Sequence, residues 1–199
     1  MQASEEAPQN NDTLVVFYSR TGHVKKMAEI IQKETNADIF EVRTTEEDKY
    51  SDSYITACFQ ASKHCLTGFL PKLAGTVDVT KYQKIFIGTP VWCWTVSRPI
   101  ASFLKNIDLS GKTIIPFISE GGSGHERALN AMKEEALNAT FLGEYLFNEK
   151  KAPTDLEKDI KDWIEALNKK PENKENEPTK ENREVSPSET PENNEQPNQ

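Results

Sequence analysis

Residues 14–24 read LVVFYSRTGHV, and this stretch decides the fold because its pattern changes from strand to helix around one glycine. Leu14 to Tyr18 are a short continuous apolar run, which is typical of a strand buried on both faces. After Gly22 the apolar residues recur at helical spacing, at Val24, Met27, Ala28 and Ile31. The sequence therefore predicts a buried strand, a polar loop and an amphipathic helix in direct succession.

The same alternation continues along the chain. Further apolar strand patterns lie at residues 39–42, 85–88, 113–118 and 141–147. Helical patterns lie at residues 54–66, after Pro99, around Ala128 to Met132, and in a last helix that opens with Thr154 and Glu157 in capping-box spacing. Strands that alternate with helices require right-handed crossovers and a parallel sheet covered on both sides. We therefore expect an α/β fold, a three-layer doubly wound domain with a parallel five-stranded sheet.

The two ends of the chain differ in composition from its middle. Residues 169–199 contain five prolines among many Glu and Asn, and Val185 is their only large apolar residue. Residues 1–12 likewise carry little that can build a core. Such segments cannot bury enough apolar surface to offset the entropy lost on ordering. We expect disordered segments at residues 1–12 and 169–199, and one folded domain at residues 13–168.

Composition also limits the classes of function that the chain can have. The formal net charge is −8, whereas nucleic-acid-binding proteins usually carry a basic stripe and anionic membranes attract basic segments. No apolar run approaches the roughly 20 residues of a membrane span, and the first residues lack the pattern of a secretory signal. Three cysteines are an odd number and too few for a disulfide scaffold. We expect a cytoplasmic protein that binds neither nucleic acid nor membrane.

Three loops at one edge of the predicted sheet are the candidate ligand site. In doubly wound sheets, ligands bind at the carboxyl ends of the strands, which here precede residues 19–24, 89–96 and 119–124. In the first loop, Ser19 and Thr21 stand beside Gly22 at a helix N-terminus, where hydroxyls, free backbone N–H groups and the helix dipole attract an anion. An ordinary capped turn uses the same residue types, so both interpretations stay open.

The other two loops are aromatic and glycine-rich. Trp92 and Trp94 expose apolar area in a polar loop unless something covers them, and a planar ligand stacked on an indole would do so. Alternatively, the indoles fill the gap between the loop and the helix that follows it. In the third loop, Gly121, Gly122 and Gly124 let backbone amides approach a ligand closely. A flexible start to the next helix is the alternative there.

Five motifs in chain order resemble those of the flavodoxin family, in particular its short bacterial members, and span roughly residues 13–167. They are Tyr18-Ser-Arg-Thr-Gly-His, Gly88-Thr-Pro-Val-Trp, Phe103-Leu104, Asp108-Leu-Ser-Gly-Lys-Thr and Phe117-Ile-Ser-Glu-Gly-Gly-Ser-Gly. The resemblance implies the strand order 2-1-3-4-5 and non-covalently bound FMN.

The same resemblance assigns roles to the three loops. The first surrounds the ribityl phosphate, the second covers one side of the isoalloxazine with one of its tryptophans stacked on the ring, and the third lines the ring's other edge. The cofactor-binding residues that it implies are Ser19, Arg20, Thr21, Gly22, His23, Val24, Thr89, Pro90, Val91, Trp92, Cys93, Trp94, Thr95, Ser119, Glu120, Gly121, Gly122, Ser123 and Gly124.

The chain departs from the family pattern at two places. Val24 stands where the phosphate loop of the family usually ends in Thr, and Cys93-Trp94 replace a Trp-Gly-like pair. Loss of one hydrogen bond to a charged group costs about 1.5–3 kcal/mol unless Arg20, His23 or water compensates.

The leading hypothesis is an FMN-binding electron carrier between redox partner proteins, acting as a monomer or weak dimer. An NAD(P)H-dependent FMN or quinone reductase on the same fold is the second hypothesis, and an FMN-free interaction module is the third. Electron transfer through a flavin needs no protein acid or base, so no catalytic residue is expected. Cys58, His64 and Cys65 lack a fourth ligand nearby, so no metal site is expected either.

Overall fold

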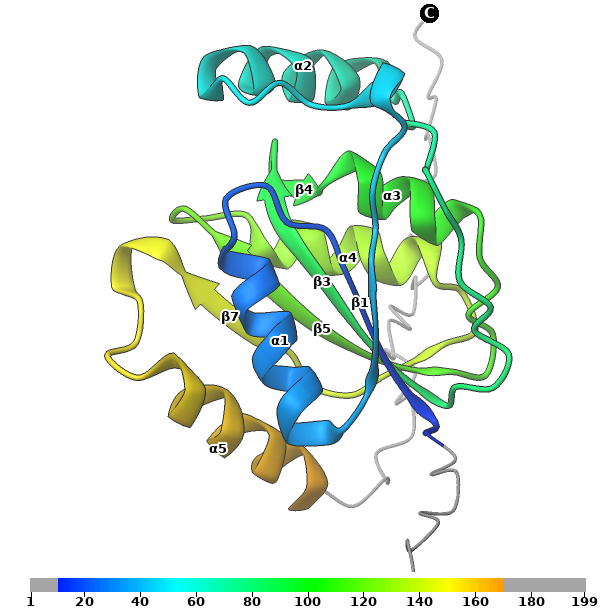
Figure 1. Cartoon of the computed structure of the whole chain (residues 1–199), viewed down its shortest axis with the longest axis vertical. Coiled ribbons are helices and arrows are strands. Elements are labelled where there is room, and N and C mark those ends of the chain that lie inside the picture. The colour runs from blue at the N-terminus through cyan, green and yellow to red at the C-terminus, as the bar shows by residue number, and fades with distance from the viewer. Residues whose placement is uncertain (1–10, 170–199) are drawn as a thin grey trace, which may run out of the picture.

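A mostly parallel sheet runs through the middle of the computed structural model, which describes residues 11–169 (Figure 1). Its strands are β1 (Thr13–Phe17), β2 (Asp38–Glu41), β3 (Lys84–Trp92), β4 (Thr95–Val96), β5 (Thr113–Glu120), β6 (Thr140–Phe141) and β7 (Tyr145–Asn148). The order is β2-β1-β3-β5, β6 and β7 both pair in parallel with β5, and β4 pairs antiparallel with β3. With β6 and β7 taken together as the fifth strand, the predicted order 2-1-3-4-5 is confirmed.

Helices cover both faces of this sheet. They are α1 (His23–Thr35), α2 (Tyr54–Thr67), α3 (Arg98–Lys105), α4 (His125–Glu135) and α5 (Leu156–Lys169), with the 3-10 helices η1 (Glu46–Asp48) and η2 (Glu149–Lys151). Alternate residues of β1 face opposite ways, so Val15 and Phe17 pack with α1 and α5, whereas Leu14 and Val16 pack with α3 and α4. In Figure 1, α1 and α5 lie on one side of the sheet, and α3 and α4 lie on the other. The predicted three-layer α/β fold is thereby confirmed.

Gly88 lies at the tightest point between β3 and the layer of α1. A Cβ atom placed there would lie 2.2 Å from Phe117 Cζ and 2.9 Å from Val24 Cγ1. Real Cβ contacts of this length do not occur, so only glycine lets β3 pass beneath these two side chains.

The fifth strand is broken, which corrects the prediction of one continuous strand at residues 141–147. The backbone carbonyls of Lys112, just before β5, and of Ile114 accept hydrogen bonds from the backbone N–H groups of Thr140 and Leu142. The backbone N–H and C=O groups of the even-numbered residues of β5 therefore point toward this strand. Pro116 is the next even-numbered residue, and it has no N–H to donate. β6 therefore ends at Phe141, and pairing with β5 resumes only at Tyr145, opposite Phe117.

β3 and β5 are longer than predicted, and this changes the second and third loops. Their pairing continues past the expected ends at Gly88 and Ile118, up to Pro90 beside Ser119. β3 then turns back through a tight hairpin into β4, so residues 89–95 are strand and hairpin rather than an irregular loop. The continued ladder carries these residues beyond the body of the sheet.

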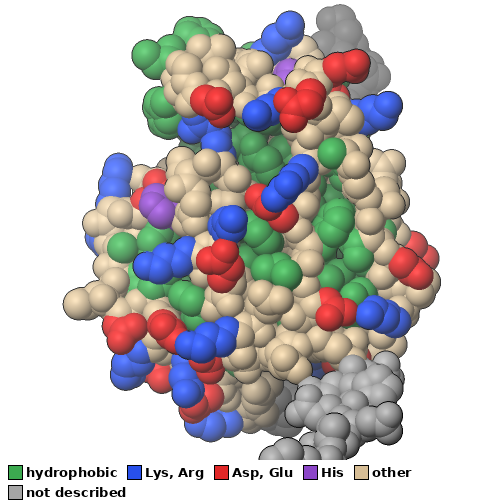
Figure 2. Space-filling view, viewed as in Figure 1, with side chains coloured by type: hydrophobic (Ala, Val, Ile, Leu, Met, Phe, Trp, Pro, Cys, Tyr) green, Lys and Arg blue, Asp and Glu red, His purple; other side chains and the backbone are tan. Residues whose placement is uncertain are grey.

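α2 lies at the far end of the molecule, beyond the carboxyl ends of the strands (Figure 1). Only the small side chains Ala57 and Ala61 of this helix are buried. Its exposed large hydrophobic residues are Tyr54, Ile55, Phe59 and Leu66. Figure 2 shows hydrophobic side chains gathered at this end of the surface. The helix agrees closely with the expected range 54–66 but is held by little apolar contact.

The last helix begins differently from the prediction. α5 starts at Leu156, and the backbone N–H of Lys158 donates to Asp155 Oδ1 at 3.0 Å. Asp155, rather than Thr154 with Glu157, therefore caps the helix. A carboxylate is a strong cap because it also complements the positive end of the helix dipole.

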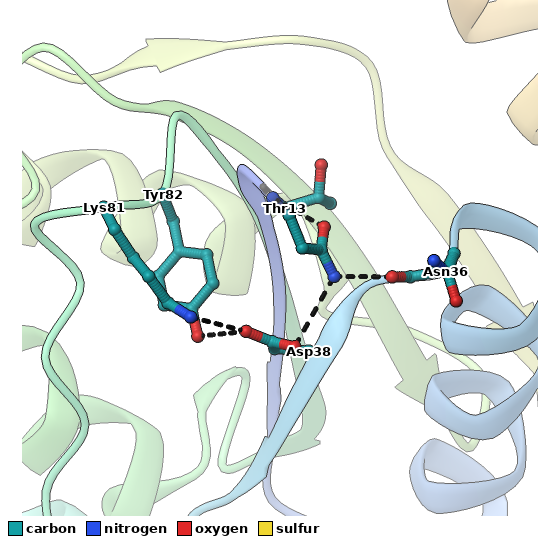
Figure 3. A network of polar contacts seen from close by, with 6 residues as sticks. Thr13, Asn36, Asp38, Lys81 and Tyr82 are labelled. Atoms are coloured by element: carbon teal, nitrogen blue, oxygen red, sulfur yellow. Dashed lines mark hydrogen bonds and ion pairs between the residues drawn. The ribbon is translucent and has the colours of Figure 1, made fainter. Parts of the chain in front are cut away.

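The predicted tails fall almost entirely outside the described residues. Asn11, assigned to the first tail, donates its side-chain amide to Asn36 O and to Asp38 Oδ1. Asp38 also accepts from Lys81 Nζ at 2.9 Å and from the Tyr82 hydroxyl, and Figure 3 shows this network at the amino end of the sheet. Asn11 thus joins the fold, as does Lys169 at the end of α5. Within residues 11–169, no helix combines the length and hydrophobicity needed to cross a bilayer.

Candidate functional site

The β1–α1 loop is open toward a ligand. Gly22 adopts φ 92° at the N-terminus of α1, and no side chain caps this helix. The Gly22 N–H donates to Ser19 Oγ at 3.2 Å, which folds the loop back over the start of the helix. Uncapped N–H groups at a helix N-terminus carry partial positive charge, so the loop can accept an anion.

Arg20 contributes a donor that the protein leaves unused. Its terminal nitrogen makes long contacts to the carbonyls of Ser51 and Asp52, at 3.4 and 3.3 Å. Its Nε atom is buried and has no partner among the described residues. The guanidinium carbon lies 5.6 Å from the centre of the Tyr54 ring, so Arg20 spans the gap between the loop and α2. A buried unpaired donor costs free energy that an anionic ligand would recover.

A pocket of about 290 Å³ lies between this loop, α2 and the end of β3. Its volume is close to the lower end of the range of about 300–1,000 Å³ for small-molecule sites. The residues that line it are Arg20, Thr21, Tyr54, Ala57, Cys58, Ala61, Ser62, Pro90, Val91, Trp92, Cys93, Ser119, Gly121 and Glu149. Small side chains on the α2 wall and an indole on the β3 wall give the pocket two apolar sides.

The two tryptophans have different surroundings. Trp92 borders the pocket and packs edge-on against Tyr50 and Tyr18, with ring centroids 4.7 and 5.5 Å apart. Burial raises the pKa of Tyr18 to about 12, so the ring that packs against Trp92 is uncharged. Trp94 is 60% exposed and borders a different, shallower pocket with residues 122–127. Trp92 therefore faces the smaller but more enclosed of the two pockets, called the main pocket below, whereas the pocket beside Trp94 is open and has a volume of about 550 Å³.

The third loop lies against the hairpin. A Cβ at Gly124 would lie 3.0 Å from Val91 Cγ1 and 3.1 Å from Trp94 Cδ1, so the glycine permits this close approach. Glu120 is buried and accepts from His125 Nδ1 at 3.0 Å and from the Asn148 side chain at 3.2 Å. These bonds tie the end of β5 to α4 and β7.

Glu149 brings a carboxylate to the same site. Its Oε1 accepts from the Ser119 hydroxyl at 2.9 Å and lies 3.1 Å from His23 Nδ1. The sequence reading missed this residue, although it follows directly after the last strand, and the rule that ligands bind at the carboxyl ends of strands would have included it. It also missed the α2 residues of the pocket, because the helical pattern at residues 54–66 does not indicate which distant segments that helix meets.

The structure separates the predicted site residues into groups. Arg20, Thr21, Pro90, Val91, Trp92, Cys93, Ser119 and Gly121 line the main pocket. Trp94, Glu120, Gly122, Ser123 and Gly124 border the shallower one. Ser19, Gly22 and His23 form the loop beside the main pocket, and Thr95 lies in β4. Val24 and Thr89 are buried, Val24 in the core under the sheet-facing side of α1 and Thr89 bonded to Ser97, so neither side chain lines either pocket.

Comparison with known proteins identifies the family of the chain. A model of the family described as flavodoxin matches residues 12–167. No curated protein matches the chain. A flavoprotein from Lactobacillus acidophilus NCFM, solved in complex with FMN, is 25% identical, with a TM-score of 0.59 over 68% of this chain and 93% of that one.

Two further solved structures share the fold. A predicted flavoprotein from Bacteroides uniformis ATCC 8492 is 24% identical, with a TM-score of 0.65 over 78% of this chain and 98% of that one. Oxidised flavodoxin 2 from Bacillus cereus is 16% identical, with a TM-score of 0.50 over 79% and 97% of the two chains. Since the family match extends over nearly all of the described residues, the chain belongs to the flavodoxin family.

Proposed function

We propose that the chain binds FMN non-covalently in the main pocket and carries electrons between redox partner proteins. Membership of the flavodoxin family supports the cofactor, as does the FMN complex of the Lactobacillus acidophilus neighbour. The observation that carries the proposal is the unpaired, buried Nε of Arg20 beside a helix N-terminus that no side chain caps.

The β1–α1 loop would hold the phosphate. Thr21 offers a hydroxyl, Gly22 and the first residues of α1 offer backbone N–H groups, and Arg20 offers its guanidinium. Val24 is a core residue, so in this chain the phosphate must be bound without the hydroxyl usual at that position. The residues present fit a phosphate because they leave donors unpaired on one side of the pocket.

The flat ring would lie between α2 and the β3–β4 hairpin. Ala57 and Ala61 of α2 and Trp92, which packs on them and against two tyrosines, would together form its apolar wall. FMN supplies the redox chemistry, and the pocket excludes water and sets the electrostatic surroundings. Glu120 and Glu149 place negative charge beside the site, which makes the addition of electrons less favourable and lowers the reduction potential.

Titration of the purified full chain with FMN, followed by quenching of flavin fluorescence, tests the binding. We expect Arg20→Met to weaken FMN binding about tenfold or more, because a charge-assisted hydrogen bond is lost. Riboflavin, which lacks the phosphate, should bind the variant and the original chain equally well. Arg43→Met is the matched control, because Arg43 pairs with Glu41 at an exposed position. A chain that ignores FMN would contradict the proposal and favour an interaction module.

Addition of NADH or NADPH under anaerobic conditions tests the role as a carrier. An electron carrier keeps its oxidised flavin spectrum until a redox partner or chemical reductant is added. Rapid bleaching by either nicotinamide alone would instead identify an NAD(P)H-dependent FMN or quinone reductase.

A further inference from the structure

A hydrogen bond joins α2 to the loop that precedes it, next to the indole that borders the main pocket. The hydroxyl of Tyr50 lies 2.9 Å from Nδ1 of His64, and the centroids of the two rings are 5.5 Å apart. Tyr50 is buried and also packs edge-on against Trp92, with 4.7 Å between the centroids. Trp92 in turn lines the pocket. A continuous chain of contacts therefore runs from His64 through Tyr50 and Trp92 to the pocket.

The surroundings of the two groups assign the direction of this hydrogen bond. Burial raises the pKa of Tyr50 well above its ordinary value of about 10, so the hydroxyl keeps its proton. Within residues 11–169, Nδ1 of His64 is the only group that hydrogen-bonds to this hydroxyl. A buried hydroxyl without an acceptor is unfavourable, so Tyr50 donates and Nδ1 accepts. The imidazole is then neutral and carries its proton on Nε2.

A second proton on the imidazole would remove this acceptor. The imidazolium presents an N–H to the Tyr50 hydroxyl, so the hydroxyl proton must turn away and lose its partner. Lys63 on α2 and Arg98 on α3 place positive charge near the ring, and Asp48 of η1 places negative charge there. Burial of the ring, followed by the charge of Lys63, lowers the pKa of His64 below its ordinary value of about 6.5. The folded chain therefore favours the neutral imidazole.

This hydrogen bond matters to α2 because little else attaches the helix. α2 buries only two alanines, so polar contacts contribute a large share of its attachment. The ring of His64 also lies against that of Phe69, with 4.4 Å between the centroids. The guanidinium of Arg98 donates to the backbone carbonyls of Gly68 and Phe69, both at 2.8 Å. His64 is thus one of a small number of groups that hold the last turns of α2.

We propose that Tyr50 and His64 are positioning residues of the pocket, which hold Trp92 and α2 in place while His64 is neutral and release them when it takes up a proton. Because the folded state lowers the pKa of His64, the contact is fully formed above about pH 6.5 and is lost as the pH falls through the lower pKa of the folded chain. The effect on the cofactor rests on the proposed function: FMN should bind more weakly when α2 is released.

Hydrogen exchange of the purified full chain, measured by mass spectrometry at pH 8 and pH 5.5 and corrected for the intrinsic exchange rate, tests the release without any ligand. We expect the protection of α2 to fall about fivefold more in the original chain than in His64→Asn, whose side-chain oxygen replaces the acceptor but does not titrate. The amides of α1 are the internal reference and should respond equally in both chains. Tyr50→Phe keeps the ring but lacks the donor, so its α2 should already be less protected at pH 8.

Titration with FMN at the same two pH values tests the consequence for the pocket. We expect the affinity of the original chain to fall about threefold more than that of His64→Asn. Both chains keep His23, His125 and the same ligand, so only His64 distinguishes them. Tyr50→Phe should bind FMN about threefold more weakly than the original chain at pH 8. Tyr82→Phe is the matched control and should bind normally, because the Tyr82 hydroxyl donates to Asp38 at the other end of the sheet.

Equal responses to pH in the original chain and in His64→Asn would overturn the inference, as would full protection of α2 in Tyr50→Phe at pH 8. Circular dichroism of each variant identifies a loss of fold, and His64→Gln supplies a second non-titrating side chain if His64→Asn unfolds. The two proposals fail separately. A pH-dependent α2 in a chain that does not bind FMN would refute only the proposed function. FMN binding with the same pH profile in both chains would refute only the role of His64.

Discussion

The helix α1 follows the loop that lines the pocket and α2 lines it directly, but the rest of the molecule holds the two helices very differently. α1 buries Val24, Met27, Ala28, Ile30 and Ile31 against the sheet and α5. α2 buries two alanines and leaves Phe59 and Leu66 73% and 87% exposed. Burial of a large aliphatic side chain contributes about 1.5–3 kcal/mol, so nearly all of the stabilisation lies on the α1 side.

This difference gives the two sides of the pocket different mobility. The β1–α1 loop is attached to a packed helix and strand, so its geometry is fixed by the core. The wall formed by α2 is free to adjust to the ligand. If FMN binds as proposed, its phosphate would be recognised by the firmly packed part of the fold, and its ring would be covered by a helix that buries only two alanines.

Truncation of one isoleucine on each helix is the strongest test of this comparison. Ile31 of α1 is fully buried, whereas Ile55 of α2 is 68% exposed. We expect Ile31→Ala to lower the free energy of unfolding by about 3–4 kcal/mol, because it leaves a cavity in the core. Ile55→Ala should change it by less than about 0.5 kcal/mol. Urea unfolding followed by circular dichroism measures both, and equal effects would show that α2 is packed as firmly as α1.

Gly88→Ala tests the close packing beneath α1. The added methyl group would meet Phe117 and Val24, and overpacking of this kind costs about 1–3 kcal/mol. Gly75→Ala is the control, because a Cβ at Gly75 has open space and the backbone is not left-handed. Thermal unfolding of the two variants should differ clearly, and a neutral Gly88→Ala would mean that β3 and Phe117 can move apart.

The two tryptophans test the wall that faces α2. We expect Trp92→Ala to weaken FMN binding about tenfold, because the variant loses an aromatic wall that also packs on Ala57 and Ala61. Trp94→Ala should weaken it less than about twofold, since Trp94 borders the other pocket. Fluorescence titration with FMN decides between them, and the reverse ranking would place the flavin on the outer side of the hairpin.

Asp38→Asn gives the smallest expected effect and concerns the end of the sheet away from the pocket. Hydrogen bonds from Tyr82 and then Lys81 lower the pKa of Asp38. A carboxylate with a lowered pKa in the folded state stabilises the fold above its ordinary pKa of about 4, and this contribution is lost as the pH falls below that value. Solvent screening keeps it below about 1 kcal/mol.

Unfolding measured from pH 7 to pH 3 checks the expectation for Asp38→Asn. The stability advantage of the original chain over the variant should shrink below pH 4, while FMN binding at pH 7 stays the same. A constant difference across this range would show that the carboxylate charge plays no part.

The fold was predictable because buried strands and amphipathic helices leave strong local patterns. Leu14 to Tyr18 and the helix after Gly22 identified the first unit, and the later units repeated it. The break in the fifth strand was missed because its cause, the absent N–H of Pro116, lies on a neighbouring strand and acts across the ladder. The N-cap at Asp155 was missed because Thr154, one residue earlier, satisfied the same local rule.

The candidate site was predictable only in outline. The three loops follow from the rule for carboxyl ends of strands, and the structure brings parts of all three to one pocket. That Val24 and Thr89 point into the protein could not be read from their positions in a motif, since motif spacing carries no information on which side chains a core absorbs. The contribution of α2 depends on contacts between segments far apart in sequence, which no local pattern encodes.

The interrupted fifth strand also protects the molecule from its own copies. β6 and β7 have two and four residues, and the opposite outer strand, β2, also has four. A long, flat outer strand offers a row of free N–H and C=O groups on which another polypeptide can continue the sheet. Here each outer strand is too short to serve as such a template, so Pro116, by dividing one of them, guards against aggregation.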